Sequence, residues 1–279
     1  MTDELSIKPG RGALPPQVDP GPGRPWIIAH RGARTEAPEN TGAAFRRALS
    51  YPIDGVELDV QMSADGAVVI HHDRTLKKVA GLRRRVADLT WEELRRLDAG
   101  SWFDPAFAGE PLLGFDEMMA MLAGRTRLFI EIKAFKADRR SGRAARLTDC
   151  VLRALSDSKA VQHHDSLWIL SFDPDVLRYA GEQAPDLRLV LDVSKADARR
   201  LKKAPDTITG RLSAFCIHVG AVSGSLVDWA HGLGKQVFAY TCNDSATLKK
   251  LSTAGTDGIL TDDPAWLVEE MKKHRRAGA

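Results

Sequence analysis

Short apolar runs recur along the chain, and longer stretches with a helical spacing of apolar residues lie between them. Runs of this length, bounded by turn-forming residues, predict buried β-strands. Polar residues mark the starts of the intervening helices: Thr41, Asp173 and Asp263 each precede a stretch with an apolar face, and Pro follows both aspartates. The expected strands are Trp26–His30, Gly55–Val60, Arg127–Lys133, Leu167–Phe172, Arg188–Val193, Ala214–Val219, Gln236–Cys242 and Gly258–Thr261.

Eight strands that alternate with helices over about 250 residues predict an α/β protein with a (β/α)8 TIM barrel. A doubly wound open sheet is the alternative, because alternation alone does not decide whether a sheet closes. We expect one catalytic domain over residues 25–279. Residues 1–24 are polar and rich in Pro and Gly, which predicts a flexible N-terminal arm.

One segment interrupts the alternation. Ala67–His72 is a further strand-like run that follows the Asp65-Gly66 turn, too close to the second strand for a parallel crossover. We therefore expect a hairpin extension of that strand. Residues 74–111 then form a small insertion in which Thr90 and Glu93 have the spacing of a capping box. An insertion after a barrel strand is typical of a lid or a pocket wall.

The composition excludes several classes of function. The 279 residues are 43 % hydrophobic and 28 % charged, with a net charge of +3, which is too weak to indicate a nucleic-acid or membrane partner. No segment has the length and apolarity of a signal peptide or a membrane span. The three cysteines have no paired spacing, so we expect a reducing, cytoplasmic location. The sequence leaves the oligomeric state open.

Acidic side chains at strand ends indicate a metal site. Side chains alternate between the two faces of a strand, so Glu57 and Asp59 should point into the barrel if their apolar neighbours meet the helices. The same alternation places Glu131 and Lys133 inside the barrel. Carboxylates that converge in a partly dry mouth need positive charge, and an all-oxygen ligand set favours Mg²⁺ or Ca²⁺ over Zn²⁺.

Each of these residues also has an ordinary structural interpretation. A Glu-x-Asp pair on a strand is more often a solvated face or an ion pair, and a single histidine such as His30 is more often a core residue. The position of His30 at a strand end, followed by Arg31 and a glycine, favours a phosphate site, because a guanidinium suits phosphate oxygens. Alternation directs only one of His71 and His72 toward the site.

The order of these motifs resembles the glycerophosphodiester phosphodiesterase family over about residues 26–266. The matching motifs are His30-Arg31-Gly32, Pro38-Glu39-Asn40-Thr41, Glu57-Leu58-Asp59-Val60, His72-Asp73, the run from Leu97 to Phe103, Glu131-Ile132-Lys133, Ser171-Phe172 and the run from Gly258 to Pro264.

The resemblance implies hydrolysis of glycerophosphodiesters, as small-molecule substrates, to sn-glycerol 3-phosphate and an alcohol. It implies a divalent cation, Mg²⁺ or Ca²⁺, held by Glu57, Asp59 and Glu131. General acid–base catalysis falls to His30 and His72, the histidine that precedes Asp73. The substrate and phosphate contacts fall to Arg31, Lys133, Phe172 and Tyr240, and Tyr240 stands where the family usually has Trp. The insertion is expected to shape the glycerol pocket.

Several questions stay open in the sequence. A lysophospholipase D-like enzyme on the same barrel is the alternative, and it would need an apolar channel, for example along Phe103, Phe107 and Leu112–Leu113. A non-catalytic barrel protein is the second alternative, but it would not need two proton-transfer groups. The residues do not decide which histidine is the acid, or whether water or the substrate's own 2-hydroxyl attacks phosphorus.

Overall fold

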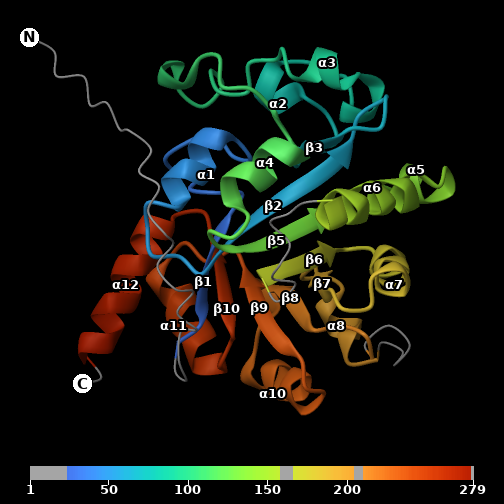
Figure 1. The fold of residues 1–279 in the computed structure, drawn as a ribbon. Coiled ribbons are helices and arrows are strands. Elements are labelled where there is room, and N and C mark those ends of the chain that lie inside the picture. The colour runs from blue at the N-terminus through green and yellow to red at the C-terminus, as the bar shows by residue number, and fades with distance from the viewer. Residues whose placement is uncertain (1–23, 158–165, 204–209, 278–279) are drawn as a thin grey trace, which may run out of the picture.

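The barrel closes because the first strand pairs with both the second and the last. The computed structural model describes residues 24–157, 166–203 and 210–277, so the expected N-terminal arm lies almost wholly outside the described residues. β1 pairs in parallel with β10 on one side and with β2 on the other, which excludes the open sheet (Figure 1). The strands of the ring are β1 (Trp26–His30), β2 (Gly55–Met62), β5 (Arg127–Ile132), β6 (Leu167–Ser171), β7 (Arg188–Val193), β8 (Ala214–His218), β9 (Gln236–Tyr240) and β10 (Gly258–Thr261).

All eight expected barrel strands are present, and the differences lie at their ends. β2 runs two residues further than expected, because it continues into the hairpin with β3 (Val68–Ile70). Four expected strands extended one or two residues too far, since Lys133, Phe172, Val219 and Cys242 already belong to the loops above the barrel. These loop residues follow the carboxyl ends of the strands, where barrel enzymes carry their sites.

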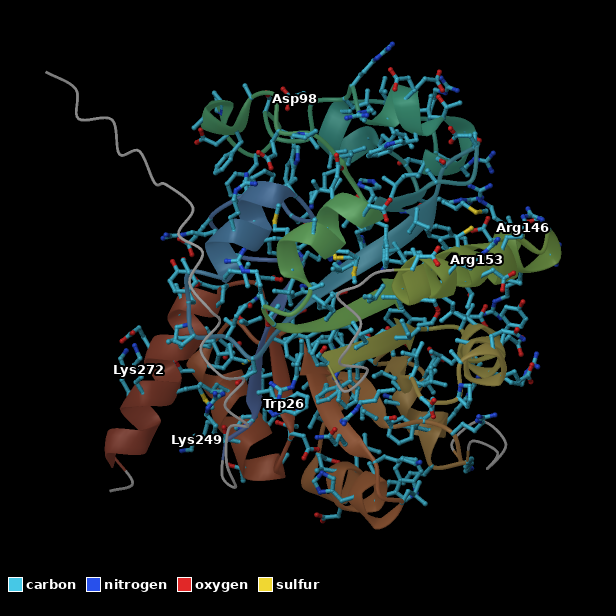
Figure 2. The ribbon with its side chains drawn as sticks, in the orientation of Figure 1. Trp26, Asp98, Arg146, Arg153, Lys249 and Lys272 are labelled. Atoms are coloured by element: carbon cyan, nitrogen blue, oxygen red, sulfur yellow. The ribbon has the colours of Figure 1, made fainter. Side chains whose placement is uncertain are left out.

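Helices cover the outside of the ring, and the expected caps are formed. Thr41 accepts a hydrogen bond from the backbone N–H of Ala44, and Asp173 accepts one from that of Asp175. The helices outside the insertion are α1 (Gly42–Ala48), α4 (Phe115–Leu122), α5 (Lys136–Arg140), α6 (Arg143–Asp157), α7 (Pro174–Gln183), α8 (Ala198–Leu201), α10 (Gly224–Gly232), α11 (Ser245–Ala254) and α12 (Pro264–Ala277). Charged side chains such as Arg153 on α6 and Lys272 on α12 point outward from them (Figure 2). No helix among the described residues is long and apolar enough to cross a membrane.

Two separate cores follow from the alternation along the strands. The outward side chains, among them Val56, Leu58 and Ile130, pack against the helices. The inward side chains fill one end of the barrel with rings that stack or meet edge to face at centroid distances of 5.2–6.4 Å. These rings belong to Trp26, Phe129, Trp168 and Phe238. They close the amino-terminal end of the barrel and leave the other end to polar groups.

The insertion is a small layer above the strand ends of β2 and β3, drawn in teal and green in Figure 1. It contains α2 (Lys77–Ala80) and α3 (Trp91–Leu94), and it returns to the barrel through β4 (Leu113–Gly114), antiparallel to β3. The predicted capping box opens α3, with Thr90 and Glu93 bonded in both directions. Its own apolar cluster consists of Val69, Leu76, Val79, Val86, Leu89, Leu94, Ala99 and Leu112. Trp102 packs on the edge of this cluster, with the Lys78 ammonium 4.6 Å from its ring centroid.

Candidate active site

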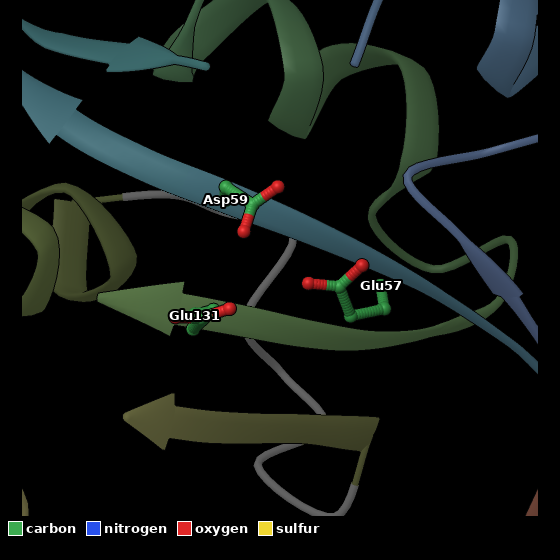
Figure 3. A group of neighbouring side chains, drawn as sticks. All are labelled: Glu57, Asp59 and Glu131. Carbon is green, nitrogen blue, oxygen red and sulfur yellow. The ribbon is translucent and has the colours of Figure 1, made fainter. Parts of the chain in front are cut away.

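Three carboxylates converge at the mouth of the barrel. Glu57 and Asp59 lie on β2, Glu131 lies on β5, and the parallel register places Asp59 beside Glu131. Each of the three is at least 92 % buried, and one ligand oxygen from each lies within 4.8 Å of the others (Figure 3). The alternation predicted from the sequence is therefore confirmed for all three side chains.

Two cations partly balance this negative charge. The Lys133 ammonium lies 2.7 Å from both Asp59 Oδ1 and Glu131 Oε2. Arg31 Nε lies 3.1 Å from Asp59 Oδ2, and the Asn40 side-chain amide donates to the same oxygen at 2.8 Å. Asp59 thus takes most of the available positive charge and hydrogen bonds.

The pKa values reflect this unequal sharing. Burial alone would raise the pKa of Asp59, but Lys133 and Arg31 outweigh it and hold that pKa well below its usual range. Burial raises the pKa of Glu57 well above its usual range, and the Asp59 carboxylate adds to the effect. Burial also raises the pKa of Glu131 to about 7, although Lys133 opposes the shift. The protein's own cations therefore leave Glu57 and Glu131 short of positive charge.

A divalent cation fits this cluster. The donors are all carboxylate oxygens, which suit a hard cation such as Mg²⁺ or Ca²⁺ better than Zn²⁺. A cation would also supply the positive charge that Glu57 and Glu131 lack. The residues present fit a metal site in both donor chemistry and charge.

A tight turn brings the end of β1 to the same place. Arg31 and Gly32 have positive φ angles of 57° and 85°, and the Arg31 backbone N–H donates to Glu57 Oε2 at 3.0 Å. A side chain at Gly32 would lie 2.8 Å from Ala44 in α1, so only glycine fits this packing. The turn therefore fixes His30 and Arg31 beside the carboxylates.

Each of the two proposed histidines has an aspartate partner. His30 Nδ1 lies 2.6 Å from Asp262 Oδ1, and His72 Nδ1 lies 2.8 Å from Asp73 Oδ1. Such contacts place the proton on Nδ1 and leave Nε2 as the basic nitrogen. Burial lowers the pKa of His30, and it lowers the pKa of His72 to about 4, so both rings are neutral at pH 7. For the carboxyl of Asp262 burial acts in the opposite direction and raises the pKa, but His30 and Arg34 outweigh it and lower this pKa to about 2.

The structure separates His71 from His72. His72 lines the cavity at the mouth, and its backbone carbonyl accepts from the Gln61 amide at 3.2 Å. His71 is 4 % exposed, and its ring lies 3.3 Å from the carbonyl of Thr75, away from the cavity. Of the two histidines, His72 therefore lines the cavity and His71 does not.

The cavity at the mouth of the barrel has a volume of about 380 Å³. It extends from the carboxylates and histidines to the opposite wall of the barrel. Phe172, which is 45 % exposed, meets Tyr240 edge to face at 6.0 Å, and both line the cavity. The other lining residues are His30, Arg31, Glu57, His72, Glu131, Lys133, Leu170, Asp192, Cys216, His218, Val219, Thr241 and Leu260.

The insertion contributes nothing to this lining among the described residues, contrary to the expectation that it shapes the pocket. Trp102, Phe103 and Phe107 instead pack on one another edge to face, at 5.8 and 5.6 Å. Leu112 and Leu113 are buried in the two apolar clusters on either side. These contacts favour a packing role for the insertion's apolar residues over an acyl-chain channel.

Sequence reasoning missed several residues of the site. Asp262 belongs to the Thr261-Asp262-Asp263-Pro264 run at the end of the last strand, where its inward position could have been inferred. Asn40 and Glu39 have no predicted role beyond their place in the Pro38-Glu39-Asn40-Thr41 motif; Glu39 is in contact with Arg31, Arg34 and Lys78. Asp192 interrupts an apolar strand, which is the signal that could have identified it.

Comparison with known proteins gives the family. The model of the Glycerophosphoryl diester phosphodiesterase family matches residues 30–266. A glycerophosphodiester phosphodiesterase of Caldanaerobacter subterraneus subsp. tengcongensis is 32 % identical over 88 % of this chain and 98 % of its own length. One of Bacillus altitudinis is 29 % identical over 88 % of this chain and 99 % of its own.

Solved structures agree. A phosphodiesterase of Oleispira antarctica, in complex with the product sn-glycerol-3-phosphate, has a TM-score of 0.77 at 26 % identity, over 89 % of this chain and 97 % of that one. A glycerophosphodiester phosphodiesterase of Agrobacterium tumefaciens has a TM-score of 0.69 at 26 % identity, over 88 % of this chain and 100 % of that one.

The closed barrel and these matches define a phosphoric diester hydrolase. The chain belongs to the glycerophosphodiester phosphodiesterase family, and it is an enzyme of that type.

The raised pKa values predict how stability depends on pH without metal. Between about pH 4.5 and 7 the folded protein holds more protons on Glu57 and Glu131 than the unfolded chain does, so stability falls as pH rises. Glu57→Gln removes part of the repulsion. In EDTA it should melt about 2–6 °C above the unsubstituted protein at pH 8, with a smaller gain at pH 5. Scanning calorimetry at pH 8 and pH 5 measures the two melting temperatures. An equal gain in melting temperature at both pH values would contradict the prediction.

Proposed function

We propose that this enzyme hydrolyses glycerophosphodiesters to sn-glycerol 3-phosphate and an alcohol, with a divalent cation and two histidines. The observation that carries the proposal is a cluster of three buried carboxylates at a cavity that is lined by two of them, two cations and two histidines. The Oleispira antarctica structure, described as a complex with the product sn-glycerol-3-phosphate, supports the choice of substrate. The small-molecule substrate, the lack of a nucleic-acid partner and the cytoplasmic location are part of the same proposal.

Glu57, Asp59 and Glu131 would hold the cation, Mg²⁺ or Ca²⁺. When bound, it would stabilise negative charge on the phosphate oxygens during hydrolysis. Arg31 and Lys133 line the same cavity and stay protonated at neutral pH, because Asp59 raises the pKa of both against the effect of burial. They are assigned to the phosphate as fixed positive charges.

His30 and His72 are assigned to proton transfer. Each ring is neutral and oriented by an aspartate through Nδ1, so each can take a proton at Nε2. One would remove the proton of the attacking hydroxyl, and the other, once protonated, would give a proton to the leaving alkoxide. The negative phosphate diester, when bound, raises imidazole pKa values and so favours the protonated ring. Phe172 and Tyr240 are assigned to the apolar wall beside the substrate.

The central experiment tests metal dependence. Release of sn-glycerol 3-phosphate from glycerophosphocholine should cease in EDTA and return with Mg²⁺ or Ca²⁺, more than with Zn²⁺, because the ligands are all oxygens. Glu131→Gln should weaken Mg²⁺ binding in calorimetry, whereas the exposed Glu92→Gln should not. Full turnover by metal-stripped enzyme would disprove the metal assignment.

The adjacent histidines provide a test of catalytic roles. His72→Ala should lower kcat by on the order of 100-fold or more, because it removes a proton-transfer group. His71→Ala should lower kcat by less than about 5-fold and act on the melting temperature instead, because its ring is buried outside the cavity. Steady-state kinetics and melting curves for both variants measure these changes in kcat and in melting temperature. The opposite ranking would show that the roles are exchanged.

Asp262 is assigned as a positioning residue for His30. Asp262→Asn keeps a polar group beside Nδ1 but removes the charge, so we expect kcat to fall about 10- to 100-fold with little change in KM. The Asp262 carboxylate raises the pKa of His30, so its loss should shift the acid limb of the kcat profile to lower pH if His30 must be neutral. An unchanged profile would reduce Asp262 to a structural role.

A further inference from the structure

Asp192 is an acidic residue of the cavity that the proposed chemistry does not use. It lies one residue before the end of β7, and the interior-facing Val190 precedes it by two residues, so its side chain points into the barrel. Asp192 is 7 % exposed and lines the cavity. Its Oδ2 atom is buried without a hydrogen-bond partner among the described residues.

The surroundings of Asp192 suit a neutral hydroxyl group. Cys216, the register partner of Asp192 on β8, is hydrogen-bonded to the carboxyl, but a thiol is a weak partner. Burial raises the pKa of Asp192 well above its usual range, and Glu131 adds to the effect. In either protonation state the carboxyl can bond an alcohol: a carboxylate oxygen accepts from the hydroxyl, and a protonated carboxyl can also donate to it. A buried polar atom without a partner is costly, so a ligand that supplies the missing hydrogen bond is favoured.

The position of Asp192 in the ring decides which part of the substrate it meets. In the closed order of strands, β7 lies four places from β1 and so on the opposite wall from His30 and Arg31. A phosphate held by Arg31 would therefore have β7 across the cavity, within the reach of one of its substituents. The products of different glycerophosphodiesters share glycerol 3-phosphate and differ in the alcohol. The invariant glycerol fits an enclosed, buried wall, and a variable alcohol needs an open side.

We propose that Asp192 is a specificity-determining residue that hydrogen-bonds a hydroxyl of the substrate's glycerol moiety. The proposal rests on the function proposed above. It deepens that function by assigning the glycerol pocket to the β7–β8 wall and not to the insertion. His218, two residues beyond Cys216, extends this wall; its Nδ1 accepts from the Gly220 backbone at 3.0 Å, which leaves Nε2–H as a donor.

A matched pair of ligands tests the assignment. The probes are sn-glycerol 3-phosphate and n-propyl phosphate, which has the same carbon chain without hydroxyl groups. Calorimetry in Mg²⁺ measures both dissociation constants for each protein. The unsubstituted enzyme should prefer glycerol 3-phosphate by about 10- to 100-fold. Asp192→Leu, of similar size, should reduce the preference to less than about 3-fold and leave propyl phosphate binding nearly unchanged.

Control variants separate recognition from folding. Asp192→Asn retains a donor and an acceptor and should keep most of the preference. Asp197→Leu removes an exposed carboxylate from the loop after β7 and should keep all of it. If Asp192→Leu does not fold, Asp192→Ala provides the same comparison. A preference that survives in both Leu and Ala variants, or an equal loss for both ligands, would overturn the proposal.

Measurements of turnover and of ligand binding distinguish failure of the proposed function from failure of the Asp192 assignment. If the enzyme does not release glycerol 3-phosphate from glycerophosphodiesters, the proposed function fails while the ligand preference still reports on Asp192. If turnover is normal but the Asp192 variants discriminate between the two ligands as the unsubstituted enzyme does, only the present inference fails.

Discussion

Repulsion among three buried carboxylates is the constraint on which the arrangement of the site depends. Parallel register between β2 and β5 places Asp59 beside Glu131, and strand alternation adds Glu57 on the same face. Lys133 and Arg31 are drawn to Asp59, so the remaining two carboxylates hold protons or need a cation. The same lack of positive charge that should lower stability at high pH would favour a bound cation, because both effects follow from burying acidic groups away from water.

The barrel can carry this polar cluster because its other end is closed by apolar packing. Trp26, Phe129, Trp168 and Phe238 meet one another inside the barrel below the carboxylates. Large rings bury much apolar surface and exclude water from one side. The interior is thus divided into an apolar end that stabilises the fold and a polar end that holds the site. Substitutions at the apolar end should act mainly on the stability of the fold, and substitutions at the polar end should act mainly on the rate of hydrolysis.

The sequence predicted the barrel, its eight strands and the inward carboxylates, because each depends on local alternation along a single strand. It did not predict partners that come from distant strands. Asp262 approaches His30 only because β10 pairs with β1, a consequence of closure that no local pattern contains. From the sequence, the insertion is expected at the pocket because it follows a strand beside the acidic residues. Its aromatic residues instead pack on one another. Sequence spacing cannot distinguish apolar residues that line a pocket from apolar residues that form a small core.

Moving the pocket wall from the insertion to β7 and β8 changes how substrate choice is explained. Asp192 is enclosed, whereas Phe172 at the cavity is 45 % exposed. A glycerol moiety held at the enclosed wall would orient every substrate alike, and the alcohol would extend toward the exposed side. Recognition would then be strict for glycerol, because a hydroxyl missing there leaves buried polar groups unpaired, and loose for the alcohol, which stays in contact with water. Under this division, residues near Phe172 would tune the preference for the alcohol without disturbing the phosphate.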